Sequence, residues 1–298
     1  MKYRLLGKTG LKVSVIGLGT WQFGGEWGKS FSAQEAEGII SHAQSLGINL
    51  IDTAECYGPD HLSERLIGQA IKGKRSEWII ATKFGHHFEK HNDRKFAFSV
   101  SDVEKQLADS LKALQTDYID LYQFHSSADE FFFNDALWAF LNKQVEAGKI
   151  RHLGASISSL GEPIEQVDAA PNYNIRSIQV VYNRLEQLPE SRIFASCAKS
   201  ELGVLARVPL ASGYLSGKYA PGAKFAANDV RSSHDIQKTE AKLLRVAEIK
   251  KQEVPAGMDM AMWALAWCLR RPEVTSVIPG GKDKKQIEQN AAAADIVI

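Results

Sequence analysis

The stretch Trp78-Ile79-Ile80-Ala81-Thr82 is the clearest indication of the fold class of this chain. It is an almost unbroken apolar run, which is typical of a strand that is covered on both faces in a parallel sheet. Similar short runs recur along the chain and predict further strands at residues 15–18, 48–51, 118–124, 152–155, 177–180, 203–206 and 274–278.

Longer amphipathic runs lie between these strands. Apolar residues at helical spacing predict helices over residues 32–43, 62–71, 103–114, 135–146, 191–199, 238–250, 260–270 and 284–294, with a weaker pattern over 161–168. Ser32 with Glu35, and Ser101 with Glu104, resemble capping boxes. Eight strand–helix pairs predict an α/β fold, a (β/α)8 TIM barrel, formed as a single domain over residues 1–298.

An open, doubly wound sheet is the rival architecture. It usually carries a glycine-rich dinucleotide turn that opens a helix directly after a strand. Gly17-Leu18-Gly19 follows the first strand, but Gln22 occupies the place of the third glycine, and no helix is predicted before about residue 32. The sequence therefore favours the closed barrel.

Segments outside the strand–helix pairs have predicted places on the barrel. Residues 4–6 and 12–14 flank Lys8-Thr9-Gly10 and predict an N-terminal β-hairpin that closes the barrel floor. Two long connections, residues 84–99 and 209–236, follow strands and are expected on the C-terminal face. Long loops on this face usually carry function.

Composition excludes several classes of protein. Of the 298 residues, 44% are hydrophobic and 24% charged, which argues against disorder, and a net charge of +1 argues against nucleic-acid or membrane-surface binding. The segment 1–8 has no apolar core of a signal peptide, and no apolar run is long enough to span a membrane. Three separated cysteines fit a reducing compartment. A soluble, cytoplasmic protein is expected.

Polar residues at the predicted strand ends are the strongest functional signal. Asp52, Lys83 and His125 follow successive strands, and Tyr57 lies in the loop after Asp52. In a barrel these four side chains converge over the C-terminal mouth. Each residue also has a structural interpretation, as a turn cap, a solvated lysine, a core histidine or a rim aromatic. Their joint placement at the ends of strands favours catalysis.

The four side chains make a coherent proton-transfer group. A free tyrosine has a pKa of about 10 and is a poor acid at neutral pH. A neighbouring lysine lowers that pKa by stabilising the phenolate, a carboxylate holds the lysine, and a histidine can hydrogen-bond a carbonyl oxygen. Such a group would protonate a developing alkoxide.

The residues that carry this chemistry lie in motifs that resemble the aldo-keto reductase superfamily, of the bacterial type with a short C-terminal loop. The motifs are Asp52-Thr53-Ala54-Glu55-Cys56-Tyr57-Gly58, Lys83, the segment 117–125 ending in His125, and Gly17-Leu18-Gly19-Thr20-Trp21. The resemblance extends almost from end to end. It implies a barrel that uses NADP(H), with Tyr57 as general acid/base, Lys83 and Asp52 as its tuning pair, and His125 as substrate orienter.

The resemblance also implies cofactor contacts. Thr20, Trp21 and Asp52 are expected at the nicotinamide end, with Ser156 and Gln179 on its carboxamide. The pyrophosphate is expected along Leu210, Ser212, Gly213 and Lys218. The adenosine end is expected against Gly280, Gly281, Lys282, Gln286, Gln289 and Asn290.

Several residues depart from the family pattern. Ile157 replaces an asparagine, and Arg207 replaces a ring-stacking aromatic, although a guanidinium can also stack or reach a phosphate. Gln286 and Gln289 replace an arginine and a glutamate, which leaves Lys282 as the main partner for a 2′-phosphate. NADP(H) is expected, with NADH as an alternative.

The expected substrate site is formed by Trp21, Trp27, Tyr57, Phe84, His86 and His125. The run His86-His87-Phe88-Glu89-Lys90-His91 suggests a metal site, but adjacent histidines point apart on a regular element, so no metal is expected. Cys56, beside Tyr57, is expected to be an inert thiol. The chain has no long tail after its last predicted helix, which predicts an open substrate site.

These observations lead to one main functional expectation and two rivals. The expected protein is a monomeric NADP(H)-dependent oxidoreductase that interconverts aldehyde, ketone or sugar carbonyls and alcohols. The first rival is an NADP(H)-binding regulatory or sensor subunit with little turnover. The second is a metal-dependent barrel hydrolase, which the lack of ligand motifs disfavours.

Overall fold

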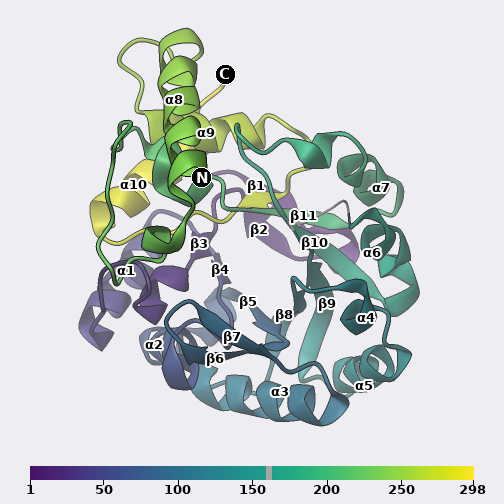
Figure 1. Ribbon diagram of the computed structural model, residues 1–298. Coiled ribbons are helices and arrows are strands. Elements are labelled where there is room, and N and C mark those ends of the chain that lie inside the picture. Colours follow the sequence, from purple (N-terminus) through teal and green to yellow (C-terminus); the bar gives the residue numbers. More distant parts are fainter. Residues whose placement is uncertain (159–162) are drawn as a thin grey trace.

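Eight parallel strands form a central barrel in the computed structural model, which describes residues 1–158 and 163–298 (Figure 1). Hydrogen bonds between the two edge strands, from Gly17 N to Val277 O and from Gly19 N to Pro279 O, close the sheet on itself. The predicted (β/α)8 barrel is confirmed. The strands, in sheet order, are β3 (Leu18–Gly19), β4 (Leu50–Asp52), β5 (Ile79–Phe84), β8 (Ile119–His125), β9 (Ile150–Ser156), β10 (Ile175–Val181), β11 (Gly203–Arg207) and β12 (Ser276–Val277).

Helices surround the barrel and bury apolar residues against it, most of them along one stripe, whereas α9 (Met260–Leu269) is buried on nearly all sides. In α1 (Ala33–Ser45) the buried residues are Ala36, Ile39, Ile40 and Ala43, at helical spacing. Figure 1 shows the ring of helices outside the strands. The others are α2 (Leu62–Ala70), α3 (Val100–Leu114), α4 (Asp129–Phe132), α5 (Asp135–Glu146), α6 (Ile164–Ala169), α7 (Ile193–Lys199), α8 (Ile236–Gln252), α9 (Met260–Leu269) and α10 (Lys284–Ala292). Among the described residues, none of these is long and apolar enough to cross a membrane.

The N-terminal ends of three helices agree only in part with the predicted caps and boundaries. The capping box of Ser32 and Glu35 is confirmed. The box predicted for Ser101 is wrong, because Ser99 caps α3 and accepts a hydrogen bond from Asp102 N at 3.1 Å. The weak helix predicted over 161–168 begins in residues outside the described part, and α6 starts at Ile164.

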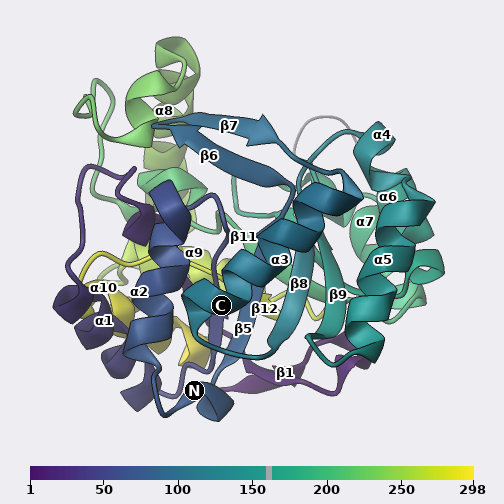
Figure 2. The ribbon, with the colours of Figure 1, turned by 90° about the horizontal axis from the view of Figure 1, so that it is seen from below.

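A hairpin closes one end of the barrel, as predicted. Strands β1 (Tyr3–Leu5) and β2 (Lys12–Ser14) pair antiparallel. Leu6 and Val13 are fully buried against Leu50 and Leu205 inside the barrel. Gly203 allows this fit, because a Cβ there would lie only 2.5 Å from Leu6 Cδ1. Figure 2 shows β1 at the end opposite to β6 and β7.

The opposite, C-terminal end carries the two long connections. Residues 84–99 include a second hairpin, β6 (His86–Lys90) and β7 (Asp93–Phe96). Residues 209–236, here called the belt, contain two 3-10 turns, at Ala211–Ser216 and Val230–Ser233. The belt crosses the barrel mouth to the N-terminal loop, where Val230 N donates to Glu26 O at 2.8 Å and Gly28 N to Asn228 O at 3.0 Å. A cavity lies between these segments and the strand ends.

Candidate active site

One cavity of about 560 Å³ opens at the C-terminal ends of the strands. This volume lies within the range of roughly 300–1,000 Å³ that is usual for ligand sites. The belt and the β6–β7 hairpin both contribute to its wall. Most of the predicted site residues line it: Thr20, Trp21, Trp27, Asp52, Tyr57, His86, His125, Gln179, Arg207, Leu210, Ser212, Gly213, Lys218, Gly280, Lys282 and Gln286.

Lys83 lies directly behind the cavity wall and joins two of the predicted catalytic residues. Its Nζ atom donates to Asp52 Oδ1 at 2.6 Å, to Thr53 O at 2.7 Å and to Tyr57 Oη at 3.3 Å. The lysine side chain is 1% exposed and that of Asp52 is 4% exposed. Because all three ammonium donors have oxygen partners, the ammonium is held in one place with one donor on the phenol.

Strand positions explain why these groups meet. Asp52 is the last residue of β4, Lys83 is the penultimate residue of β5, and His125 is the last residue of β8. All three were predicted to lie just beyond the strands, but the ladder of hydrogen-bonded pairs continues through them, and Lys83 pairs with Gln123 and His125 with Ser156. Their backbones are therefore fixed by the sheet rather than by loops.

Burial and charge act in opposite directions on this group. Burial raises the pKa of the Tyr57 phenol above its ordinary value, and the positive charge of Lys83 opposes the rise. Burial works to lower the pKa of Lys83, but Asp52 and Tyr57 together raise it. The predicted lowering of the tyrosine pKa by lysine is therefore outweighed by burial. The phenol is protonated at neutral pH, which is the form that donates a proton.

Two glutamines hold the second oxygen of Asp52. Gln123 Nε2 donates to Asp52 Oδ2 at 3.2 Å and Gln179 Nε2 donates to the same atom at 2.7 Å. Hydrogen-bond donors on both oxygens offset the cost of burying this side chain away from water. Gln179 thus has a partner within the protein that the predicted cofactor role does not include.

The substrate side of Tyr57 is formed by aromatic and imidazole rings. Trp21 stacks on Tyr57 with ring centroids 5.9 Å apart, and the edge of Trp27 meets Trp21 at 5.1 Å. The centroid of the His125 ring lies 6.1 Å from that of Tyr57, at a steep angle. Burial lowers the pKa of His125 well below its ordinary value, so the ring is neutral and can donate a hydrogen bond to an oxygen without carrying charge.

A buried carboxylate, Glu26, fastens the β6–β7 hairpin over this end of the cavity. It accepts hydrogen bonds from Trp21 Nε1 at 2.9 Å and from Asn92 N at 3.1 Å, and it forms an ion pair with Arg94. On the same hairpin, His87 Nδ1 lies 2.7 Å from Glu55 Oε1. Glu26 therefore ties the tryptophan, the hairpin turn and a hairpin cation together.

The far arm of the cavity is lined by cations and by the belt. Arg231 forms a two-point ion pair with Asp229, with Nε–Oδ1 and Nη2–Oδ2 distances of 2.8 and 2.7 Å, and its guanidinium faces the Trp27 ring. Lys282 Nζ donates to Trp27 O, and burial lowers the pKa of this lysine. These groups make the far arm positively charged.

Arg207 lies between the two arms. It is the last residue of β11, and its Nη2 donates to Ile157 O at 3.1 Å and to Ser126 Oγ at 3.3 Å. Its Nε is buried without a hydrogen-bond partner. A buried donor without a partner is costly unless a ligand satisfies it.

A few predicted residues do not reach the cavity wall. Phe84 is fully buried and packs on Tyr122 with ring centroids 4.9 Å apart, so the prediction that it forms the substrate wall is corrected. The alternation of a strand explains this, because Lys83 faces inward and its neighbour must face out. The other residues that do not line the cavity are Ser156, Gly281, Gln289 and Asn290. Asn290 Nδ2 donates to Gly280 O at 3.2 Å and supports that loop from behind.

Other residues of the site were missed by the sequence analysis. They are Glu26, Arg94, Gln123, Asp229 and Arg231. Gln123 carried a signal, since it lies two residues before His125 on the same strand and so faces the same side. Glu26 and Asp229 lie in loops, Arg231 lies in a short 3-10 turn, and Arg94 lies in the four-residue strand β7. Such short or irregular segments carry no periodicity that indicates the direction of a side chain.

Known proteins resemble this chain over nearly its whole length. Residues 15–298 match the profile of the Aldo/keto reductase family. A probable voltage-gated potassium channel subunit beta of Arabidopsis thaliana is 29% identical over all of this chain and 92% of its own length. An NADH-specific methylglyoxal reductase of Escherichia coli is 30% identical over 99% of this chain and 94% of its own. The holo form of an aldo-keto reductase of Bacillus halodurans superimposes with a TM-score of 0.82 at 28% identity, covering 100% of this chain and 92% of the other.

Proposed function

The chain belongs to the aldo/keto reductase family, and from this premise we propose that it is an NADP(H)-dependent oxidoreductase that interconverts carbonyls and alcohols. The substrate class is aldehydes, ketones or sugar carbonyls. The observation that carries the proposal is the buried Lys83 ammonium, which donates both to Asp52 and to Tyr57 Oη at the cavity wall. This arrangement suits a tyrosine that gives up a proton and is stabilised as it does so.

In the proposed reaction the substrate carbonyl oxygen lies between Tyr57 Oη and the His125 ring. When bound, a reduced nicotinamide supplies the hydride for the carbonyl carbon. The Tyr57 hydroxyl donates its proton to the oxygen that becomes the alcohol. The phenolate that remains is stabilised by Lys83 Nζ at 3.3 Å. Tyr57 then regains a proton from solvent, and the reverse steps oxidise an alcohol.

The residues of the cavity fit a nicotinamide dinucleotide. Lys218, Arg231 and Lys282 line the far arm and offer positive charge to a diphosphate and a ribose phosphate. The unpartnered Nε of Arg207 offers a buried donor between the arms. The amide nitrogen of Gln179 donates to Asp52, so we assign the amide oxygen of Gln179 to the cofactor carboxamide.

We propose NADPH as the preferred reductant because Lys282 offers a point charge for a 2′-phosphate. The preference rests on few groups. Gln286 donates to Asp283 Oδ2 at 2.9 Å and accepts from Lys282 N at 3.2 Å, and it brings no charge of its own. The Escherichia coli relative is named as NADH-specific, so both cofactors belong in any assay.

A second candidate function is a cofactor-sensing subunit with little turnover. It is favoured by the similarity to a probable potassium channel subunit beta over the whole chain. The intact set of Asp52, Tyr57, Lys83 and His125 is better explained by turnover, because a sensor does not need a proton donor. Turnover therefore remains the leading proposal.

The test measures oxidation of NADPH and NADH by wild-type protein and by Tyr57→Phe with a panel of aldehydes, ketones and sugars. Cofactor binding is followed separately by fluorescence. We expect wild-type turnover, and in the variant a loss of roughly 10²–10⁴-fold, the usual range for a general acid, with cofactor affinity unchanged. Tight binding of the cofactor by both proteins, with no turnover in either direction, would instead support the sensor.

We further propose that the protein acts as a monomer in the cytoplasm. Its three cysteines are buried and free, which suits a reducing compartment. Light scattering coupled to gel filtration should give the chain mass of 32.9 kDa. Twice this mass would contradict the monomer.

A further inference from the structure

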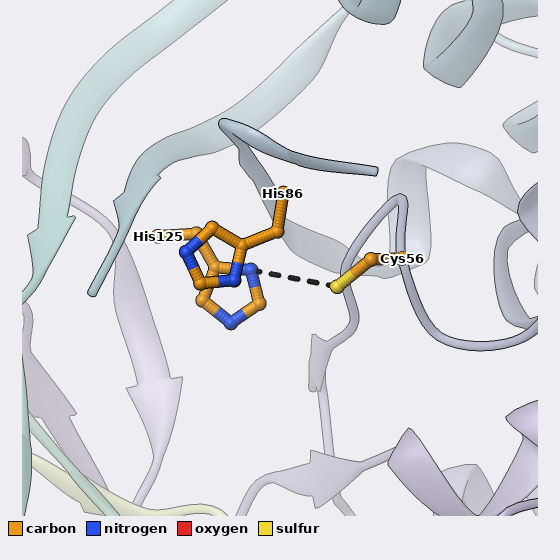
Figure 3. A group of neighbouring side chains, drawn as sticks. All are labelled: Cys56, His86 and His125. Carbon is orange, nitrogen blue, oxygen red and sulfur yellow. Dashed lines mark hydrogen bonds between the residues drawn. The ribbon is translucent and has the colours of Figure 1, made fainter. Parts of the chain in front are cut away.

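Cys56, His86 and His125 bring three metal-binding side chains together at the substrate end of the cavity (Figure 3). One ligand atom from each residue lies within 4.8 Å of the other two. Cys56 Sγ is 3.7 Å from His125 Nδ1, and the His86 ring stacks on the His125 ring with centroids 4.4 Å apart. The proposed reaction uses only His125 of these three.

The three residues come from separate parts of the fold. Cys56 lies in the loop after β4, His86 begins β6, and His125 ends β8. The residue next to His86 on the hairpin, His87, faces the other way and pairs with Glu55. The cluster is therefore tertiary, and it is distinct from the run of histidines along the hairpin.

The spacing of the cluster is close to that of a tetrahedral zinc site. Bond lengths of about 2.3 Å to sulfur and 2.0–2.1 Å to nitrogen imply a sulfur–nitrogen separation of about 3.6 Å. The Cys56–His125 pair already has this separation, at 3.7 Å. The His86 ring must turn out of its stack and move inward by about 1 Å for one of its nitrogens to reach the same point. It is only half-buried, and its Nε2 has no hydrogen-bond partner.

We propose that this cluster is an inhibitory Zn²⁺ site. Cys56 Sγ and one ring nitrogen each of His86 and His125 hold the ion, and its fourth position faces the cavity. On binding, the Cys56 thiol releases one proton to solvent and no electron is transferred. One thiolate and two imidazoles form a ligand set that binds zinc in preference to magnesium or calcium, which favour oxygen ligands.

Charge sets the character of the site. Burial lowers the pKa of both histidines, to about 4 for His86, so both rings are neutral, which is the form that binds metal. Nearby cations oppose a dication, since Lys83, Arg94 and Arg207 all act on the His125 ring. We therefore expect reversible binding rather than a permanent structural ion.

The position predicts the mode of inhibition, and this part rests on the proposed function. An ion bound to a nitrogen of His125 holds the ring that we propose to donate to the carbonyl oxygen, and its fourth position faces the cavity that receives the substrate; the centroids of the His125 and Tyr57 rings are 6.1 Å apart. The cations proposed to bind the cofactor lie at the far arm. Zn²⁺ should therefore compete with the carbonyl substrate and not with the cofactor, and a chelator should reverse it.

Metal binding itself is tested with Co²⁺, without any assay of activity. Tag-free protein is titrated with Co²⁺, and the thiolate-to-cobalt charge-transfer band in the near ultraviolet is recorded. We expect one equivalent to bind, Zn²⁺ to displace it, the band to vanish in Cys56→Ser and the affinity to fall at least tenfold in His86→Ala. No band in the wild type, or a band that survives in Cys56→Ser, would overturn the proposal.

Matched controls separate the cluster from the other cysteines and histidines. Cys197→Ser removes another buried thiol, and His91→Ala removes an exposed histidine of the same hairpin; both should leave cobalt binding unchanged. Thermal melts confirm that each variant is folded. If cobalt binds as predicted but no carbonyl is turned over, the inhibitory role falls with the proposed function and the metal site stands. If turnover occurs and Zn²⁺ leaves it unchanged, the inhibitory role is wrong.

Discussion

The two arms of the cavity are built from different kinds of structure. In the arm that we propose to be catalytic, here called the catalytic arm, Asp52, Lys83 and His125 lie within strands at their carboxyl ends, and the lysine donates hydrogen bonds to oxygens at 2.6, 2.7 and 3.3 Å. In the far arm of the cavity, here called the belt arm, Asp229 and Arg231 lie in a connection that crosses to residues 26–28. Strand register fixes the first arm, and a few loop hydrogen bonds fix the second.

The difference matches the two tasks that we propose. Proton transfer needs groups held within hydrogen-bond distance throughout the reaction, and buried strand ends provide this. A cofactor must enter and leave, and loops can open where strands of a barrel cannot. Changes in the catalytic arm should therefore alter the rate of chemistry, whereas changes in the belt arm should alter cofactor binding.

Among the changes that compare the two arms, the largest effect is expected from Lys83→Met. Loss of the ammonium removes the donor to Tyr57 Oη and leaves the buried Asp52 without its ion-pair partner. We expect the turnover rate to fall roughly 10²–10³-fold, within the range for a disrupted acid catalyst, and stability to fall by about 3 kcal/mol. Steady-state kinetics and urea unfolding measure the two effects, with the exposed Lys95→Met as control. Normal turnover in Lys83→Met would contradict the expectation that changes in the catalytic arm alter the rate of chemistry.

Asp229→Ala should weaken the cofactor rather than slow the chemistry. The change leaves the Arg231 guanidinium without its two-point partner and loosens the belt. A hydrogen bond to a charged group contributes about 1.5–3 kcal/mol of stabilisation. If this is lost from the cofactor complex, the cofactor Kd should rise roughly ten- to hundredfold. Fluorescence titration measures it, and Asn228→Ala, which keeps the backbone bond to Gly28, should bind normally. A fall in turnover at saturating cofactor, with unchanged affinity, would contradict the division of tasks.

Lys282→Gln tests whether the belt arm distinguishes NADPH from NADH. If Lys282 meets a 2′-phosphate, kcat/KM should fall about tenfold with NADPH and stay unchanged with NADH, since one charge-assisted contact is lost. Lys284→Gln, which changes an exposed lysine on α10, is the matched control. Equal losses with both cofactors would remove Lys282 from the discrimination.

The smallest effect is expected on stability, at the start of helix α3, which follows the β6–β7 hairpin. Ser99→Ala removes the side-chain cap of α3 and should cost about 1 kcal/mol. Ser101→Ala, which the sequence analysis would have chosen as the cap, should change stability by less than about 0.5 kcal/mol. Chemical denaturation measures both, and the reverse order would restore the sequence-based assignment.

The catalytic arm was predictable because strand ends obey simple rules. Eight apolar runs gave the barrel, and Asp52, Lys83 and His125 followed from their places at the ends of these runs. Phe84 was placed wrongly although the alternation next to Lys83 already pointed it outward. Seven of the eight predicted strands also ended one or two residues too early, since hydrogen-bonded pairing through polar residues leaves no apolar signal.

The belt arm and the metal-binding cluster were not predictable in the same way. Glu26 and Arg94 form an ion pair although they lie far apart in the sequence, so no local pattern predicts the contact. Asp229 faces Arg231 only because the belt turns there. The consecutive histidines of residues 86–91 led to the expectation of no metal site, whereas Cys56, His86 and His125 meet only after the barrel has closed. Such sites depend on tertiary contacts.

The most direct test of the account is a double-mutant cycle on Tyr57→Phe and Lys83→Met, read as single-turnover carbonyl reduction at saturating cofactor. We propose that Lys83 acts on the reaction through the Tyr57 hydroxyl. If so, the double variant should be no slower than Tyr57→Phe alone, to within about threefold, because the two residues act as one unit. Losses that multiply would contradict the claim and give Lys83 a separate role.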